Sequence, residues 1–281
     1  MQDETVPLAT SAVLTLCGSM SLHPVSLGAA MHLAGYRALG LSFTYVPFRV
    51  TDVRGALVGM RALGVRGLGV SMPYKQDVMP FLDELDPLAR RIGAVNTVVN
   101  EGGVLTGYNT DCVGAVRALE EVRPARGARI LVLGAGGAGR AVAFGLVDAG
   151  AEVVLANRDI DKAKQIAAEL SCSVTNLDEA CRSAGSYDVV VNATSVGMRE
   201  VDASSPVPEE ALVAGQVVMD IVYKPIKTAL VRAASRRSCR VIHGGRMLLH
   251  QAGRQFELYT GRAAPLGAMD EALREQIGLV G

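Results

Sequence analysis

The fold of this chain is decided by residues 130–158, which read ILVLGAGGAGRAVAFGLVDAGAEVVLANR. The apolar run at 130–133 has the length and the β-branched content of a buried parallel strand. The glycines that follow fit the pattern G-x-G-x-x-G, and an alanine-rich run at 140–148 predicts a helix that Gly150 ends. A second apolar run at 152–155 completes a strand–turn–helix–strand unit, which is half of a dinucleotide-binding sheet.

The glycines of this turn have separate mechanical roles. Gly134 allows the tight turn out of the strand, Gly136 lets backbone amides approach a pyrophosphate, and Gly139 lets the helix lie close to the sheet. We expect the pyrophosphate at the helix N-terminus, beside Gly137 and Ala138, because unpaired N–H groups and the helix dipole favour an anion there.

The end of the second strand predicts which cofactor binds. NAD sites usually carry Asp or Glu about 20 residues beyond the glycine turn, where the carboxylate bonds the ribose 2′-hydroxyl. Here Asn157 and Arg158 stand at that place, and a guanidinium suits a 2′-phosphate. We therefore expect NADP. NAD is the alternative, because the Asp159 carboxylate would repel a phosphate unless it points away, and Arg158 also suits a solvated loop.

Composition and charge exclude several classes of function. The chain has 281 residues, enough for one large or two modest domains, and its 28 basic residues balance 28 acidic ones. This balance gives no reason to expect nucleic acid or a membrane surface as a partner. The N-terminus lacks the basic segment of a secretory signal, and no apolar run reaches bilayer-spanning length. The five scattered cysteines have no metal-binding spacing, so we expect a reduced, cytoplasmic protein without a metal. The sequence does not fix the oligomeric state, and a monomer or a homodimer is expected.

The first third of the chain alternates strands and helices, which predicts a small α/β sheet of its own. The expected strands lie at 8–17, 41–48 and 64–72. A polar turn is expected at 18–24, and helices are expected at 25–39, 53–63, 73–82 and 86–91. A hairpin is expected from two strands at 94–100 and 104–109.

The rest of the chain predicts a second sheet and two terminal helices. Helices are expected at 111–121, 161–170 and 177–183, and strands at 187–192, 216–221 and 240–242. Two last helices, at 247–259 and 269–277, lie beyond the sheet and are expected to pack back on the first domain. We therefore predict a two-domain α/β protein: a substrate domain at 1–111, a Rossmann-type dinucleotide-binding domain at 112–244, and C-terminal helices at 245–281.

Three loops at the ends of predicted elements are polar in an otherwise apolar chain. They contribute Ser71 and Lys75, Asn96, and Asp111. Taken singly, Ser71 and Asp111 suit helix N-caps, Asn96 suits a turn and Lys75 suits a solvated surface. Taken together they fit hydride transfer to a carbonyl, because a lysine held by a carboxylate can protonate or stabilise the forming alkoxide.

The chain resembles the shikimate dehydrogenase family nearly from end to end and in motif order. The pieces that carry the resemblance are V-S-M-P-Y-K, G-A-V-N-T, G-Y-N-T-D-C-V-G, G-A-G-G-A-G-R-A, A-N-R, N-A-T-S-V-G-M, D-I-V-Y-K-P-I-K-T-A-L and M-L-L-H-Q-A. The resemblance implies NADP-linked reduction of 3-dehydroshikimate to shikimate, with Lys75 and Asp111 as the catalytic pair.

The same resemblance implies roles for further residues. Substrate contacts are implied for Ser21, His23, Ser71, Asn96, Tyr223 and Gln251. Cofactor contacts are implied for Gly134, Gly136, Gly137, Ala138, Gly139, Asn157, Arg158 and Lys162, and on the nicotinamide side for Thr194, Ser195, Met198, Gly245 and Met247.

Four positions depart from the family pattern. His23 replaces the second of two serines that hold the substrate carboxylate; a histidine either donates to that carboxylate or narrows the pocket. Gly69 stands where the family usually has an asparagine that bonds a ring hydroxyl, and such an amide is worth about 1 kcal/mol. Lys162 stands where arginine is frequent and Asp159 where threonine is frequent, which weakens the clamp on the 2′-phosphate.

These departures leave two alternatives to a shikimate dehydrogenase. One is a paralogue acting on quinate or another cyclic hydroxy acid, with NADP or NAD. The other is a cofactor-binding module without turnover, against which the intact Lys75 and Asp111 argue.

Overall fold

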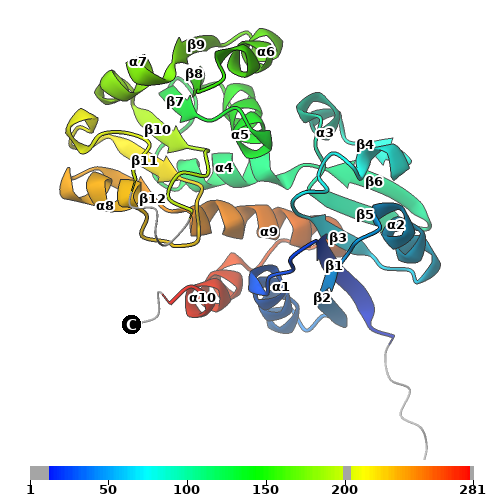
Figure 1. Ribbon diagram of the computed structural model, residues 1–281. Coiled ribbons are helices and arrows are strands. Elements are labelled where there is room, and N and C mark those ends of the chain that lie inside the picture. Colours follow the sequence, from blue (N-terminus) through cyan, green and yellow to red (C-terminus); the bar gives the residue numbers. More distant parts are fainter. Residues whose placement is uncertain (1–12, 199–203, 279–281) are drawn as a thin grey trace, which may run out of the picture.

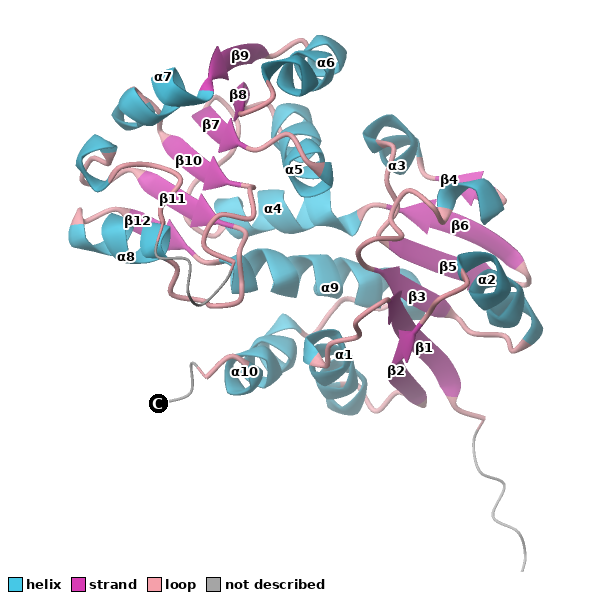
Figure 2. Cartoon of the chain, viewed as in Figure 1, coloured by secondary structure: helices cyan, strands magenta, loops and turns pink. Residues whose placement is uncertain are grey.

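The computed structural model describes residues 13–198 and 204–278, and it contains two sheets on either side of a central pair of helices (Figure 1). The first sheet has six strands in the order β2-β1-β3-β5-β6-β4, and the second has six in the order β12-β11-β10-β7-β8-β9. The central helices, α4 (Thr110–Glu120) and α9 (Gly244–Thr260), pack against each other (Figure 2).

The first sheet is mixed. Its parallel part pairs β1 with β2 and β3, and β3 then pairs antiparallel with β5, which forms the predicted hairpin with β6. Its strands are β1 (Thr15–Ser21), β2 (Phe43–Arg49), β3 (Gly67–Val70), β4 (Glu84–Leu85), β5 (Thr97–Glu101) and β6 (Val104–Tyr108). The helices around it are α1 (Leu27–Ala38), α2 (Val53–Ala62), α3 (Pro87–Ile92) and the short 3₁₀ helix η1 (Met79–Phe81).

The predicted position of the first strand was wrong, since β1 begins and ends later than 8–17. It continues through 18–21, in the stretch predicted as a polar turn, because it pairs residue by residue with β2 as far as Ser21 and Arg49. A Cβ at Gly18 would lie 2.2 Å from the Val46 carbonyl oxygen, so glycine is needed for this close approach and does not mark a turn. Residues 8–12 lie outside the described residues.

The helix predicted at 73–82 was also wrong. The segment consists of turns followed by η1, and the Met72–Pro73 peptide bond is cis. The Lys75 carbonyl accepts a hydrogen bond from the Val95 N–H at 2.8 Å, and the Tyr74 hydroxyl donates to the Val50 carbonyl at 2.7 Å. These tertiary bonds hold the segment out of the helical conformation that Pro73 alone would allow.

The second sheet is parallel throughout, with its strands pairing in the order of dinucleotide-binding sheets when read from β7 outward. Its strands are β7 (Arg129–Leu133), β8 (Glu152–Asn157), β9 (Ser173–Asn176), β10 (Val189–Asn192), β11 (Val217–Asp220) and β12 (Arg240–Ile242). Its helices are α5 (Gly137–Asp148), α6 (Ile160–Leu170), α7 (Leu177–Arg182), α8 (Ala229–Arg236) and the 3₁₀ turns η2 (Ala184–Ser186) and η3 (Glu209–Ala211). This confirms the predicted Rossmann-type architecture.

Two strands and one α-helix were absent from the prediction. Strands β4 and β9 are short, largely polar edge strands without an apolar run, so no sequence pattern marks them. Helix α8 did carry a signal. The Thr228 hydroxyl caps it by accepting from the Val231 N–H, and its buried residues Leu230, Val231, Ala233 and Ala234 recur at helical spacing.

The C-terminal helices return to the first sheet, as predicted. Helix α9 and helix α10 (Leu266–Gln276) form one buried cluster with α1, centred on Tyr36, Phe256, Tyr259 and Met269. In Figure 1 α10 lies beside α1 at the lower edge of the molecule.

Helix α4 is held closely between α9 and α5 by two glycines. A Cβ at Gly114 would lie 2.8 Å from the Met247 carbonyl oxygen of α9, and a Cβ at Gly145 of α5 would lie 2.8 Å from the Cys112 carbonyl oxygen. Within the described ranges 13–198 and 204–278, no helix has both the length and the apolar character needed to cross a membrane.

Candidate active site

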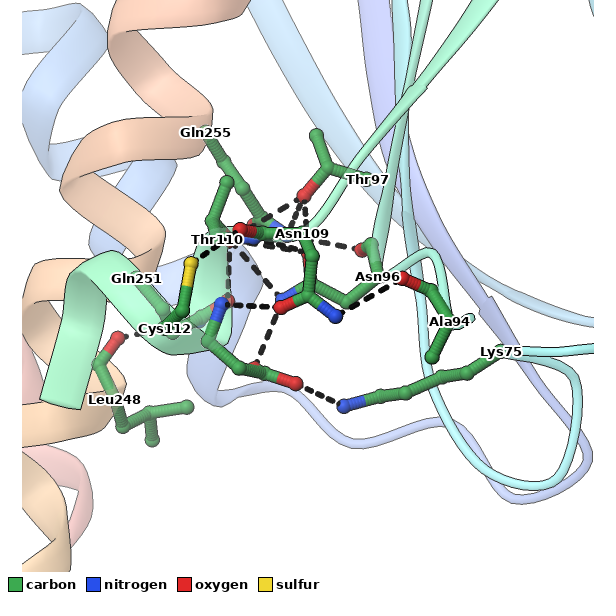
Figure 3. A network of polar contacts seen from close by, with 11 residues as sticks. Lys75, Ala94, Asn96, Thr97, Asn109, Thr110, Cys112, Leu248, Gln251 and Gln255 are labelled. Carbon is green, nitrogen blue, oxygen red and sulfur yellow. Dashed lines mark hydrogen bonds and ion pairs between the residues drawn. The ribbon is translucent and has the colours of Figure 1, made fainter. Parts of the chain in front are cut away.

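The predicted lysine–carboxylate pair forms in the structure. Lys75 lies on the loop that follows β3, Asp111 lies in the first turn of α4, and the Lys75 Nζ donates to Asp111 Oδ2 at 2.5 Å (Figure 3). The lysine side chain is 26% exposed and the carboxylate 12%, so the pair is largely shielded yet reachable from solvent. A pair in this setting can exchange a proton with a ligand while water is mostly excluded.

The start of α4 leaves the Asp111 carboxylate free for this pairing. Asn109 is the N-cap of the helix, and its Oδ1 accepts from the Asp111 N–H at 3.1 Å. Its Nδ2 donates to the Ala94 carbonyl at 2.9 Å, which ties the helix to the loop before β5. The interpretation of Asp111 as the N-cap was therefore wrong, and so was that of Ser71, which no helix follows.

Asn96 holds the carboxylate from its other side. Its Nδ2 donates to Asp111 Oδ1 at 2.8 Å and to the Thr110 hydroxyl at 3.0 Å, while its Oδ1 accepts from the Thr110 N–H at 2.7 Å. Asn96 is almost fully buried, and its amide is committed to α4, so it does more than close a turn. The two carboxylate oxygens of Asp111 thus have different partners, one an amide and one an ammonium.

A further layer of polar side chains supports Asn96, and sequence reasoning missed most of it. The Thr97 hydroxyl donates to Asn96 Oδ1 at 2.8 Å, and Gln255 Nε2 of α9 donates to the Thr97 hydroxyl at 3.0 Å (Figure 3). Gln251, one turn earlier on α9, accepts from the Thr110 hydroxyl at 3.4 Å. The spacing of the two glutamines, i and i+4, puts both on one helix face, and that is the signal that would have found Gln255.

The other residues implied in substrate binding lie at the same edge of the first sheet or beyond the second. Ser21 ends β1 and is buried. The Ser71 N–H, just beyond β3, donates to the Met20 carbonyl at 3.1 Å, so the two serines lie on adjacent segments of the first sheet. His23 and Ser71 are exposed. Tyr223 is partly buried in the segment after β11, which belongs to the second sheet.

The glycine turn after β7 has the geometry expected for a pyrophosphate. Gly134 has φ +111°, and a Cβ there would lie 2.8 Å from the Ala193 carbonyl oxygen. A Cβ at Gly139 would lie 2.1 Å from the Gly134 carbonyl oxygen, so α5 packs directly on the turn. At Gly136 a Cβ would meet no protein atom within 4 Å, and α5 begins at Gly137 without a side-chain cap. Packing therefore demands glycine at 134 and 139, while 136 and the uncapped N–H groups beyond it suit an anion.

The end of β8 presents two cations. Arg158 and Lys162 are exposed, and neither forms an ion pair with another described residue. Asp159 is the N-cap of α6, and its Oδ1 accepts from the Lys162 N–H at 3.2 Å. Its carboxylate is thus committed to the helix. Asn157 Oδ1 accepts from the Ala135 N–H at 3.3 Å and so ties this strand end to the glycine turn.

The turn after β10, predicted to lie beside the nicotinamide, is held in place by hydrogen bonds to a buried carboxylate. Asp220 accepts from Asn192 Nδ2 at 3.0 Å, from the Val222 N–H at 3.0 Å and from the Thr228 hydroxyl at 2.6 Å, and burial raises the pKa of Asp220. Asn192 Oδ1 in turn accepts from the Thr194 hydroxyl at 2.6 Å. This network fixes the turn that carries Thr194, Ser195 and Met198.

The remaining predicted cofactor residues lie at the start of α9. Gly245 and Met247 are both buried there, and Met247 belongs to the core of the second sheet. No cluster of three or more His, Cys, Asp or Glu side chains suited to a metal occurs in the described part of the chain. The five cysteines, all within it, are free thiols.

Comparison with known proteins identifies matches along most of the chain. Residues 23–98 match the family described as "Shikimate dehydrogenase substrate binding domain", 117–221 match "Shikimate / quinate 5-dehydrogenase", and 244–274 match "Shikimate 5'-dehydrogenase C-terminal domain". A relative from Moorella thermoacetica, named shikimate dehydrogenase (NADP(+)), is 45% identical over 285 aligned residues, covering 96% of this chain and 95% of the relative.

Solved structures agree with these matches. The shikimate 5-dehydrogenase of Thermus thermophilus, in complex with NADP(H) and shikimate, superposes with a TM-score of 0.85 at 38% identity, covering 94% of this chain and 99% of that one. The quinate dehydrogenase of Corynebacterium glutamicum, in complex with NAD, superposes with a TM-score of 0.86 at 33% identity, covering 93% of this chain and 98% of that one.

Proposed function

The chain belongs to the shikimate dehydrogenase family, and we propose that it is an NADP-dependent shikimate dehydrogenase, which reduces 3-dehydroshikimate to shikimate reversibly. The observation that carries this proposal is the Lys75–Asp111 pair, held at 2.5 Å and supported by Asn96 on the first sheet, together with an uncapped glycine turn on the second. The family matches and the NADP-named relatives support the same activity over the quinate alternative.

Lys75 and Asp111 are the proposed proton-handling residues. Bound NADPH supplies the hydride that converts the carbonyl carbon to a carbinol carbon. In that direction the Lys75 ammonium donates a proton to the oxygen as negative charge develops on it, and in the reverse direction the neutral amine takes the hydroxyl proton. The Asp111 carboxylate, held by Asn96 through its other oxygen, keeps Nζ in place during both steps.

The first sheet is proposed to hold the rest of the substrate. Ser21, His23 and Ser71 lie at or beyond the carboxyl ends of β1 and β3, the edge from which the Lys75 loop also leaves. Hydroxyl and imidazole donors there suit the ring carboxylate. Asn96, Gln251 and Tyr223 are proposed to contact the ring hydroxyls or the face of the ring.

The second sheet is proposed to hold NADP in the order in which its loops occur. Gly134, Gly136, Gly137, Ala138 and Gly139 would receive the pyrophosphate, since the N–H groups at the start of α5 have no side-chain cap. Asn157, Arg158 and Lys162 would receive the 2′-phosphate, and Asp159, the N-cap of α6, directs one carboxylate oxygen to the Lys162 N–H. Thr194, Ser195, Met198, Gly245 and Met247 would line the nicotinamide.

The proposal also covers the domain boundaries, the cellular setting and partners, and the oligomeric state. The substrate domain would comprise 1–111, the nucleotide domain 112–244 and the returning helices 245–281. We propose a reduced cytoplasmic setting, with no nucleic acid or membrane partner, and a monomer or homodimer as the working form.

Initial-rate kinetics with a panel of ring acids test the proposal. Shikimate and quinate would each be offered with NADP⁺ and with NAD⁺, and the reduced cofactor followed by absorbance. We expect kcat/KM to be highest for shikimate with NADP⁺. Higher kcat/KM for quinate, or for NAD⁺, would favour the paralogue, and cofactor binding with no turnover of any ring acid would favour the module without catalysis.

A further inference from the structure

The glycine at position 69 lies opposite Thr97 in the antiparallel pairing of β3 and β5. Directly opposed residues of such a pair project their side chains to the same face of the sheet, here the face covered by α9. A Cβ at Gly69 would lie 3.3 Å from Gln255 Nε2 and 3.2 Å from the Tyr45 hydroxyl. The carboxamide of Gln255 therefore lies over Gly69, in space that a side chain at this position would take.

Gln255 is buried, with 5% of its surface exposed, and its Nε2 bonds to Asn96 and Thr97, at the start of β5. Nε2 donates to the Asn96 carbonyl at 3.3 Å and to the Thr97 hydroxyl at 3.0 Å. Because the backbone carbonyl can only accept, the NH₂ group and not the oxygen of Gln255 must face this strand. The orientation of the amide thus follows from its partners.

This orientation is transmitted toward the catalytic pair. The Thr97 hydroxyl oxygen accepts a hydrogen bond from Gln255 Nε2. Its own proton is therefore directed to Asn96 Oδ1, at 2.8 Å. Asn96 then presents Nδ2 to Asp111 Oδ1 at 2.8 Å, and Asp111 Oδ2 remains for Lys75. The Thr110 N–H, which donates to Asn96 Oδ1, and the Asp111 carboxylate, which accepts from Asn96 Nδ2, favour the same orientation, so Gln255 acts alongside them.

We propose that Gln255 is a positioning residue for the Lys75–Asp111 pair, and that glycine at 69 is the residue that admits its carboxamide. The amide from helix α9 thus occupies the space beside β3 that an asparagine side chain at 69 would take. This inference rests on the proposed function for its kinetic readout, and on geometry alone for its structural one.

The first test compares two buried glutamines. Gln255→Met keeps the volume but removes the donor, and we expect kcat for shikimate oxidation to fall about tenfold, the value of one hydrogen bond, with KM for NADP⁺ unchanged. Gln216→Met is the matched control, because Gln216 is also 5% exposed and donates to two carbonyls, those of Ala184 and Tyr187, in the second sheet. The control should lower the melting temperature and leave kcat at the wild-type value.

The second test transfers the side-chain amide from position 255 of α9 to position 69 of β3. Gly69→Asn alone should lower kcat, because its side chain would meet Gln255 and Tyr45, and Gln255→Ala alone should lower it too. In the double variant Gly69→Asn/Gln255→Ala the side chain at 255 no longer obstructs the asparagine, and we expect kcat to exceed that of Gln255→Ala and to recover to within about threefold of wild type. Relief of the clash alone would return the double variant only to the kcat of Gln255→Ala, so a double variant no faster than Gln255→Ala would overturn the proposal.

A crystal structure of Gln255→Met gives a readout that does not need turnover. We expect the Asn96 Nδ2 to Asp111 Oδ1 contact to lengthen or the Asn96 amide to rotate; an unchanged network would overturn the positioning role. A wild-type protein that oxidises no shikimate would instead refute the proposed function, and the structural readout would still decide this inference.

Discussion

The two ends of the proposed reaction site are built in opposite ways. Around Lys75 and Asp111 every side-chain polar atom of Asn96 and Thr97 has a protein partner, and most of these side chains are buried. At the end of β8, Arg158 and Lys162 are exposed and lie outside the ion pairs of the described chain.

The difference follows from what each region must do. Proton transfer requires donor and acceptor within hydrogen-bond distance, so the groups that hold Lys75 must themselves be held. Attraction of a phosphate acts over several ångströms, and a mobile cation can close on it after binding. Substitution of Lys75 in the first region should therefore have the largest effect, and changes at Arg158 and Lys162 in the second region should have smaller ones.

The largest effect is expected from Lys75→Ala. Loss of the proton donor should lower kcat by about 10² to 10⁴-fold, while the dissociation constant of NADP⁺ stays within about twofold. Steady-state kinetics and fluorescence titration with NADP⁺ measure the two quantities. Lys164→Ala, which removes an exposed lysine of α6 paired with Asp161, is the matched control. Normal turnover by Lys75→Ala would remove the catalytic assignment.

The core behind the catalytic network should lose stability in acid through His32. The His32 ring stacks on Tyr45 at 4.3 Å, and burial lowers the pKa of His32 to about 4. The unfolded chain therefore binds more protons between pH 4 and pH 6.5, so the contribution of His32 is complete above pH 6.5 and is lost as the pH falls through 4.

His32→Phe keeps the ring stacking and removes the titrating group. The fall in the free energy of unfolding from about pH 7.5 to about pH 4.5 should shrink by roughly 2 to 3 kcal/mol relative to wild type. Urea unfolding at the two pH values measures it. An equal fall in both proteins would show that other groups cause the acid sensitivity.

In the second region, Arg158→Ala should affect the choice of cofactor. We expect KM for NADP⁺ to rise about tenfold, the value of one charge-assisted hydrogen bond, with KM for NAD⁺ unchanged. Arg182→Ala, an exposed arginine of α7 paired with Glu179, serves as control. An equal rise of KM for both cofactors would mean that Arg158 does not contact the 2′-phosphate.

The smallest effect is the response to salt. Because Arg158 and Lys162 are exposed, raising the ionic strength from about 0.05 to about 0.5 M should increase KM for NADP⁺ about threefold and KM for NAD⁺ much less. The difference between the cofactors should vanish in Arg158→Ala/Lys162→Ala. If both cofactors respond alike in the wild type, the salt acts elsewhere on the protein.

The sequence was informative where a pattern is local. The glycine turn, the strands beside it and the polar triad of Lys75, Asn96 and Asp111 follow from short motifs, and the two sheets confirm the architecture. The sequence was misleading where contacts with other segments of the chain determine the backbone conformation. The helix predicted after Pro73 does not form because Val95 bonds the Lys75 carbonyl, and β1 extends because β2 pairs with it.

Side-chain partners across the fold were the hardest to predict. Asp159 was considered only for its charge, and its second role, as the N-cap of α6 that accepts from the Lys162 N–H, was missed. Only its i, i+4 spacing from Gln251 pointed to Gln255. Its contact with Gly69 forms only after β3 and α9 have packed, and the two residues lie far apart in the sequence.

Helix α4 has a consequence for any hinge motion between the two sheets. Its first turn is bonded to the first sheet through Asn109 and Thr110, whereas its body is wedged by Gly114 and Gly145 against α9 and α5. Because α9 also packs in the cluster with α1 beside the first sheet, α4 and Asp111 would stay with that sheet in such a motion. Movement of the second sheet would then carry a bound cofactor toward or away from Lys75 and Asp111, which would remain in place.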